Sequence, residues 1–189
     1  MLNGYPLPKE VPLSCSWDRS HMLATLLFDF RDAFAGIQYE IDTKTRIVNA
    51  QAFSLGGSRM VRIYGGFAYH PLVTEDALVF TLLHETGHHR ARGRRFAGDP
   101  GIACDCLADK WAIGAGARML RHRSQRVLNL SDALRSLDEL MLSIKTSSGP
   151  VTRRNQRSQG CWGNLWTVRK SRLSDCSVPV PTGPCYYSR

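Results

Sequence analysis

The segment His84-Glu85-Thr86-Gly87-His88 constrains this chain more than any other feature, because its residue types are useful together only on a helix. Residues i and i+4 of an α-helix project from the same face, so His84 and His88 would direct both imidazoles at one point. Two imidazoles placed in this way are typical of a zinc site, and a glutamate beside the first can reach a bound water without binding the metal. The segment therefore predicts a zinc-binding helix, with His84 and His88 as ligands and Glu85 as general base.

The residues before the motif predict where this helix begins and how deeply it is buried. Thr74 is a good N-cap, and the acidic pair Glu75-Asp76 follows in the first turn, where the helix dipole favours anions. Four apolar side chains cover the other sides of the helix: Leu78, Val79, Leu82 and Leu83. A buried helix rarely carries two histidines and a glutamate without a partner for them, although a helix with solvated polar residues near its end is the alternative.

A catalytic zinc usually has three protein ligands and one open position, so a third ligand is expected outside this helix. Metzincins continue the motif with a glycine and a third histidine, but Ala91 and Arg94 occupy those two positions here. The sequence therefore excludes the metzincin class, and the third ligand must come from another element.

The segment from Cys104 to Asp109 is the best source of that ligand. Asp105 and Asp109 would share one face of a helix, so Asp105 could bind zinc while Asp109 accepts the second ring N–H of His84 or His88. Cys104 is the main alternative ligand, because a thiolate also binds zinc well. His89 and His122 are further candidates.

Hydrophobic periodicity and turn residues predict a mixture of helices and strands in one α+β domain. We expect a helix from Asp18 or Ser20 to Gly36, strands over 37–41, 46–54 and 59–69, and helices over 77–89, from Asp99 or Gly101 to about 123, and from Ser131 to 148. The expected fold is zincin-like, with a small antiparallel or mixed sheet packed on the zinc-binding helix. The predicted organisation is an N-terminal arm over 1–17, a metallopeptidase domain over 18–148 and a basic, poorly ordered tail over 149–189.

Residues 49–88, NAQAFSLGGSRMVRIYGGFAYHPLVTEDALVFTLLHETGH, resemble the core of the HtpX and CAAX-prenyl-endopeptidase group of gluzincin metallopeptidases. That group takes its third ligand from an E-x-x-A-D pattern, which the segment from Asp105 to Asp109 matches with Asp in place of Glu. The resemblance covers about residues 45–115. It implies a zinc peptidase whose strand Arg59–Tyr64 lies along the cleft and pairs with an extended peptide substrate.

The net charge of +9 is concentrated in one part of the chain. From Arg118 to Arg172 there are twelve Lys and Arg residues against three acidic ones. Such a stretch can attract nucleic acid, an anionic membrane or an acidic partner, or it can be a solvated surface. The alternative to a peptidase is therefore a zinc-stabilised protein that binds nucleic acid or another partner through this basic region.

The chain begins without a basic region followed by an apolar run, and its longest apolar runs are too short to span a bilayer. We therefore expect no transmembrane segment, a cytoplasmic location and mostly reduced cysteines. Members of the resembling group are usually embedded in a membrane, so we expect a compact version of the domain that acts on protein or peptide substrates.

Overall fold

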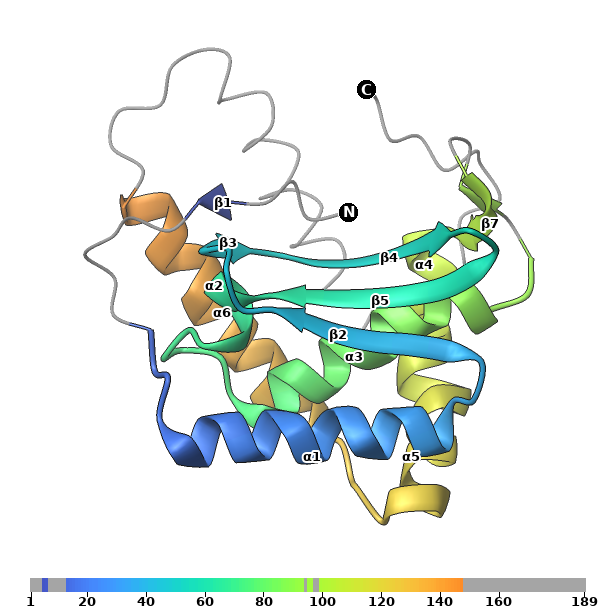
Figure 1. The fold of residues 1–189 in the computed structure, drawn as a ribbon, viewed down its shortest axis with the longest axis horizontal. Coiled ribbons are helices and arrows are strands. Elements are labelled where there is room, and N and C mark those ends of the chain that lie inside the picture. The colour runs from blue at the N-terminus through green and yellow to red at the C-terminus, as the bar shows by residue number, and fades with distance from the viewer. Residues whose placement is uncertain (1–4, 7–12, 94, 97–98, 148–189) are drawn as a thin grey trace.

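The computed structural model describes residues 5–6, 13–93, 95–96 and 99–147 (Figure 1). The elements, in chain order, are β1 (Tyr5–Pro6), α1 (Trp17–Ala33), β2 (Ile37–Asp42), β3 (Ile47–Val48), β4 (Ala50–Leu55), β5 (Ser58–Tyr64), α2 (Gly65–Ala68), α3 (Glu75–Arg90), β6 (Arg95–Phe96), β7 (Asp99–Ala103), α4 (Asp105–Trp111), the π-helix η1 (Ala112–Gly116), α5 (Ala117–Ser124) and α6 (Leu130–Ser147). The predicted tail, 149–189, lies outside the described residues. The predicted α+β class is confirmed.

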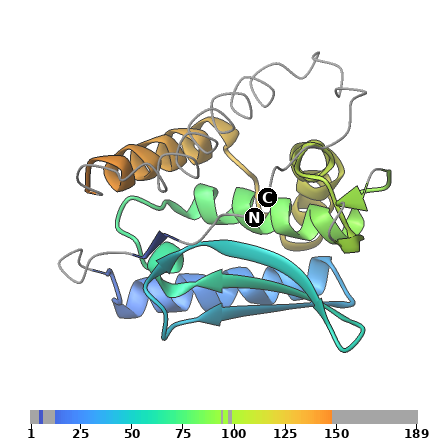
Figure 2. The same cartoon turned by 90° about the horizontal axis from the view of Figure 1, so that it is seen from above.

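The principal sheet is mixed and has the strand order β2-β5-β4. β2 runs parallel to β5, and β4 runs antiparallel to it. Figure 2 shows the layers: the sheet lies on one side of α3, and α6 lies on the other side. Helix α1 packs beside β2, and the column formed by α4, η1 and α5 contacts α3 and α1.

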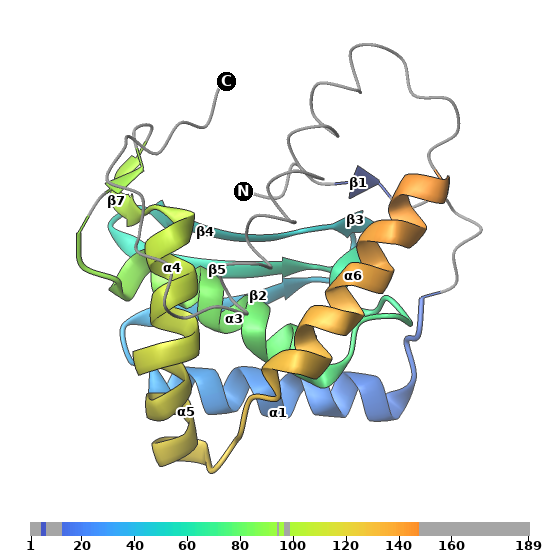
Figure 3. The ribbon, with the colours of Figure 1, turned by 180° about the vertical axis from the view of Figure 1, so that it is seen from behind.

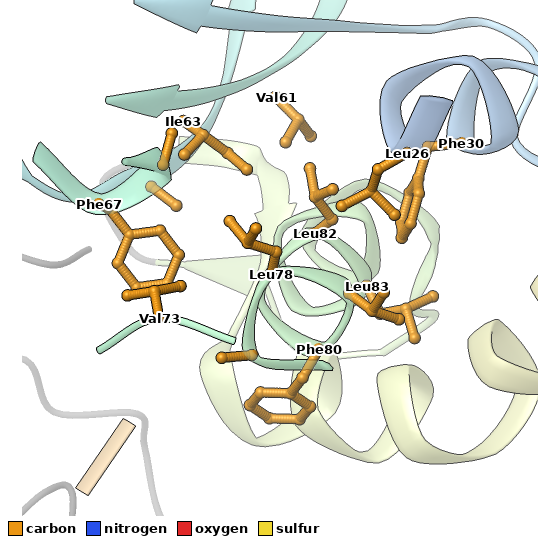
Figure 4. Packing of buried hydrophobic residues seen from close by; sticks show 14 of the residues in the cluster. Leu26, Phe30, Val61, Ile63, Phe67, Val73, Leu78, Phe80, Leu82 and Leu83 are labelled. Carbon is orange, nitrogen blue, oxygen red and sulfur yellow. The ribbon is translucent and has the colours of Figure 1, made fainter. Parts of the chain in front are cut away.

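The core forms where α3 passes between these layers. Every residue of α3 from Ala77 to His89 is buried, so this helix is enclosed on all sides. In the close view of Figure 4, Leu78 and Leu82 of α3 face the strand residues Val61 and Ile63, and α1 contributes Leu26 and Phe30 nearby. A helix packed on every side has little freedom to rotate, which holds its polar residues in one orientation.

Side-chain hydrogen bonds hold the start of α3. Thr74 is its N-cap, as predicted, and the Thr74 Oγ1 accepts from the backbone N of Ala77 at 3.3 Å. The Thr74 backbone N donates to Ser136 Oγ of α6 at 3.0 Å, and that hydroxyl donates to the Leu72 carbonyl at 2.7 Å. The start of α3 is thus hydrogen-bonded to α6, a contact that was not predicted from the sequence.

Several predicted boundaries are wrong. Helix α1 begins at Trp17, inside the predicted arm, because Ser16 is the N-cap and its Oγ accepts from Arg19 N at 3.1 Å. The strand predicted over 59–69 continues only to Tyr64, just before the pair Gly65-Gly66 that is expected to kink or end it, and α2 follows. Its two glycines allow this, because a Cβ on Gly65 or Gly66 would lie 2.8 or 2.5 Å from backbone atoms of residues 45 and 47.

The helix predicted from Asp99 or Gly101 is also wrong at its start. The chain forms the hairpin of β6 and β7 first, and α4 begins only at Asp105. From there the helical column continues to Ser124, near the predicted end.

The expectation that β5 offers a free edge to a peptide is wrong as well. β5 is the central strand, with β2 along one side and β4 along the other over its whole length. The parallel pairing of β2 with β5 joins segments separated in sequence, and no local pattern reveals it.

Among the described residues, none of the helices combines the length and the apolar character that crossing a bilayer requires.

Candidate metal centre

The two motif histidines lie in the last two turns of α3 and point to one place. The Nε2 atoms of His84 and His88 are 3.0 Å apart, and the two residues are only 4% and 6% exposed. The four-residue spacing puts the rings on one helix face, and the surrounding packing holds them there. Two ring nitrogens this close, away from bulk water, are two of the three donors of a group that could hold a metal ion.

Asp105, the first residue of α4, completes the group from the neighbouring helix. Its Oδ1 lies 3.5 Å from His84 Nε2 and 3.3 Å from His88 Nε2. Donor atoms about 2.0–2.1 Å from a tetrahedral ion are separated from each other by about 3.3 Å. The three separations lie close to that value, so this buried group could hold a metal ion.

Gly87, inside the motif, explains how a side chain as short as aspartate reaches the histidines. A Cβ at this position would lie 2.7 Å from the carbonyl oxygen and 2.9 Å from the Cα of Ala108 in α4. Only glycine therefore allows α3 and α4 to approach so closely. The motif pattern leaves this position unspecified, although glycine inside a buried helix is itself a signal of close packing.

Each histidine is oriented through its other ring nitrogen. His84 Nδ1 lies 2.7 Å from Asp109 Oδ1, and His88 Nδ1 lies 2.7 Å from the carbonyl oxygen of Ala103. Because a carbonyl only accepts, His88 must donate from Nδ1 and keep its Nε2 lone pair directed at the group. The predicted contact of Asp109 is thus with His84 and not with His88, and the role of Ala103 was not predictable because a backbone carbonyl has no residue signature.

The electrostatics favour an ionised Asp105. Burial alone would raise the pKa of this carboxyl, but its interactions with His84 and His88 outweigh burial and hold the pKa well below its usual range. The ionised carboxylate is the form of Asp105 that can bind a divalent cation.

Glu85 lies beside the group without belonging to it. The residue is 5% exposed, and its Oε2 is 3.9 Å from His88 Nε2. A buried carboxylate at the margin of a metal group, rather than within it, can exchange a proton with a water held there.

The alternative ligands predicted from sequence lie outside the group. Cys104 is buried at the N-cap of α4 but is not among the converging residues. His89 turns toward the sheet, where its Nε2 donates to the Met60 carbonyl at 2.9 Å, and His122 is exposed on α5.

No protein-family model, no curated protein and no solved structure matches this chain. Membership of the HtpX and CAAX-prenyl-endopeptidase group therefore stays a prediction that rests on the motif and strand residues alone, and function has to be argued from the geometry of the metal-binding group.

Proposed function

We propose that this protein is a zinc-dependent metallopeptidase in which His84, His88 and Asp105 hold the ion and Glu85 is the general base. One observation carries the proposal. The three donor atoms approach one another at 3.0, 3.3 and 3.5 Å, and a buried carboxylate that is not part of the group lies next to them.

The donor set supports zinc with a catalytic role. Two imidazoles and one carboxylate leave one position of a tetrahedral ion open, whereas structural zinc sites are closed by four protein ligands that are mostly cysteines. The same donors also suit ferrous iron. Glu85 favours hydrolysis, because a base that accepts a proton from water is needed in hydrolytic chemistry.

The zinc ion and the protein residues would contribute different steps of the hydrolysis. Zinc, when bound, supplies Lewis acidity and brings the pKa of a water near 7. Glu85 takes the proton from the attacking water and delivers it to the leaving amine, since its carboxylate reaches the group without binding the ion. Asp109 and the Ala103 carbonyl keep both imidazoles in the tautomer that leaves Nε2 free.

The outer side of β4, with which no other described strand pairs, supports an extended polypeptide as the substrate. β4 is an edge strand of the sheet and contacts α3. The Asn49 carbonyl accepts from Tyr64 N at 3.0 Å, so the backbone groups of Asn49 face β5. In an antiparallel ladder the backbone groups of successive residues alternate in direction, so those of Ala50, Ala52 and Ser54 point away from β5. A peptide can add to such an edge by backbone hydrogen bonds. This role replaces the one first expected of β5.

The test compares zinc-loaded wild type with Glu85→Gln on a mixture of unstructured peptides, with products identified by mass spectrometry in ¹⁸O-labelled water. We expect wild type to release products that carry one ¹⁸O at the new carboxyl terminus. Glu85→Gln should keep zinc and lose activity by at least about 100-fold, because the general base is gone.

Glu139→Gln is the matched control, since Glu139 is exposed on α6 and far from the group in sequence and in fold. It should cleave at the wild-type rate. Wild-type cleavage by Glu85→Gln, or no cleavage of any peptide by the zinc-loaded wild type, would reject the proposal.

A further inference from the structure

Helix α5 carries an exposed cationic face that the metal chemistry does not use. Arg118, Arg121 and Arg123 are all exposed. At 3.6 residues per turn they spread over an arc of about 200°, the solvent-exposed side of the helix, and we call these three residues the α5 arginine face. Among the described residues, none of the three makes an ion pair or a side-chain hydrogen bond. His122 lies between them and is exposed too.

Several other arginines of the described residues are paired, whereas Arg59 and Arg92 are exposed and unpaired like those of α5. Arg62 pairs with Glu40, and Arg135 pairs with Asp132 and Glu139. These ion pairs give the guanidinium N–H groups of both arginines a carboxylate acceptor. The α5 arginine face has no comparable acceptor.

Acidic groups beside the segment that follows α5 are already engaged. Arg126 binds both Asp29, at 2.8 Å, and Glu75, while Asp76 accepts from the backbone N of Asn129 at 2.8 Å. From Lys110 to Ser131 the chain contains no Asp or Glu at all. The positive charge of the α5 arginine face is therefore left for a partner outside the described fold.

We propose that the α5 arginine face binds the phosphate backbone of a nucleic acid. Ten of the twelve basic residues between positions 118 and 172 are arginine, the side chain whose planar fork matches phosphate oxygens in pairs. An excess that begins on α5 and continues for so long in the sequence fits a long polyanion better than a short acidic peptide. Backbone contacts of this kind do not read base sequence.

The position of the face keeps this interaction separate from the metal group. α4, η1 and α5 form one column in Figures 1 and 3, with Asp105 at its beginning. Thirteen residues separate Asp105 from Arg118, which is about 20 Å at the helical rise of 1.5 Å per residue. A nucleic acid on α5 can therefore hold the protein in place without covering the metal group, and the inference does not depend on peptidase activity.

The experiment measures binding of a fluorescently labelled 20-base-pair DNA duplex to the full chain by anisotropy across a salt series. The test variant is Arg118→Gln/Arg121→Gln/Arg123→Gln. The control, Lys44→Gln/Arg59→Gln/Arg92→Gln, removes the same net charge from exposed positions elsewhere. We expect the test variant to bind at least about 10-fold more weakly, with a salt slope smaller by up to about 2.7, and the control to bind like wild type.

Equal weakening of both triple variants would show attraction by net charge alone and would overturn the proposal, as would wild type that does not bind the duplex. Displacement of the duplex by an equal charge concentration of polyglutamate would point instead to an acidic protein partner and reject nucleic acid. Circular dichroism checks folding of each variant. Should the triple variant fail to fold, Arg118→Gln and Arg121→Gln are tested singly, each with an expected decrease in slope of about 0.9.

Discussion

At the scale of single residues, the candidate metal group of His84, His88 and Asp105 is positioned by atoms other than its three donors. The rings of His84 and His88 are oriented by Asp109 and by the Ala103 carbonyl, both at 2.7 Å. Gly87 sets the distance between the two helices that supply the three donors. The group is therefore expected to be sensitive to substitutions that leave all three donor residues in place.

Gly87→Ala tests this dependence most simply. The added methyl would lie 2.7 Å from the Ala108 carbonyl oxygen, so α4 must move away and carry Asp105 with it. We expect zinc affinity to fall at least about 10-fold and the free energy of unfolding to fall by about 1–3 kcal/mol. Competition with a chelating dye and urea denaturation of the metal-free protein would measure the two effects.

Gly114→Ala is the matched control, because a Cβ on Gly114 of η1 meets no atom within 4 Å. Its zinc affinity should be unchanged, and the better helix propensity of alanine should leave stability equal or higher. Unchanged zinc affinity in Gly87→Ala would show that the helices do not depend on this contact.

At the scale of elements, α3 is the part of the fold best predicted from sequence, because its N-cap, acidic first turn and motif are all local signals. The presence of a small antiparallel or mixed sheet was also predictable from strand-forming residues and turns. The order of its strands was not, since the parallel pairing of β2 with β5 depends on packing between distant segments. The strand β7, which precedes α4, was not predicted for a similar reason. Its Ala103 carbonyl contacts His88, a residue distant in sequence.

The tie between α3 and α6 gives a prediction at this scale. Ser136→Ala removes the hydroxyl that accepts from Thr74 N and donates to the Leu72 carbonyl, and the site is buried. We expect the free energy of unfolding to fall by about 1–3 kcal/mol, because two backbone groups lose their partner. Ser131→Ala, exposed on the same helix, should change it by less than about 0.5 kcal/mol in urea denaturation. Equal effects of the two substitutions would contradict this account of the helix start.

At the scale of the whole molecule, buried histidines make stability depend on pH. Burial, and then the charge of Arg19, lower the pKa of His70, which is 4% exposed. Its pKa in the unfolded chain is about 6.5, so below that pH the unfolded chain takes up a proton that the folded protein excludes. The stabilising contribution is therefore complete above pH 6.5 and is lost as the pH falls toward the lowered folded pKa.

His70→Asn isolates this effect, because the amide oxygen can still accept from Leu72 N as His70 Nδ1 does at 3.2 Å. In urea denaturation of the metal-free protein at pH 7.5, 6.5 and 5.5, wild type should lose stability with a steeper slope than the variant. The difference should be at most about 1.4 kcal/mol per pH unit, the value for one proton. Identical slopes would mean that His70 does not titrate differently in the two states.

The proposed chemistry needs one zinc ion held by His84, His88 and Asp105, and the metal content of the purified chain measures whether it is there. Elemental analysis would be made on wild type, Asp105→Ala and Cys104→Ser after exposure to zinc and iron together and removal of unbound metal. We predict one zinc per chain in wild type and in Cys104→Ser, and little retained zinc in Asp105→Ala. Wild type without zinc, wild type that prefers iron, or full retention by Asp105→Ala with loss in Cys104→Ser would contradict the proposal.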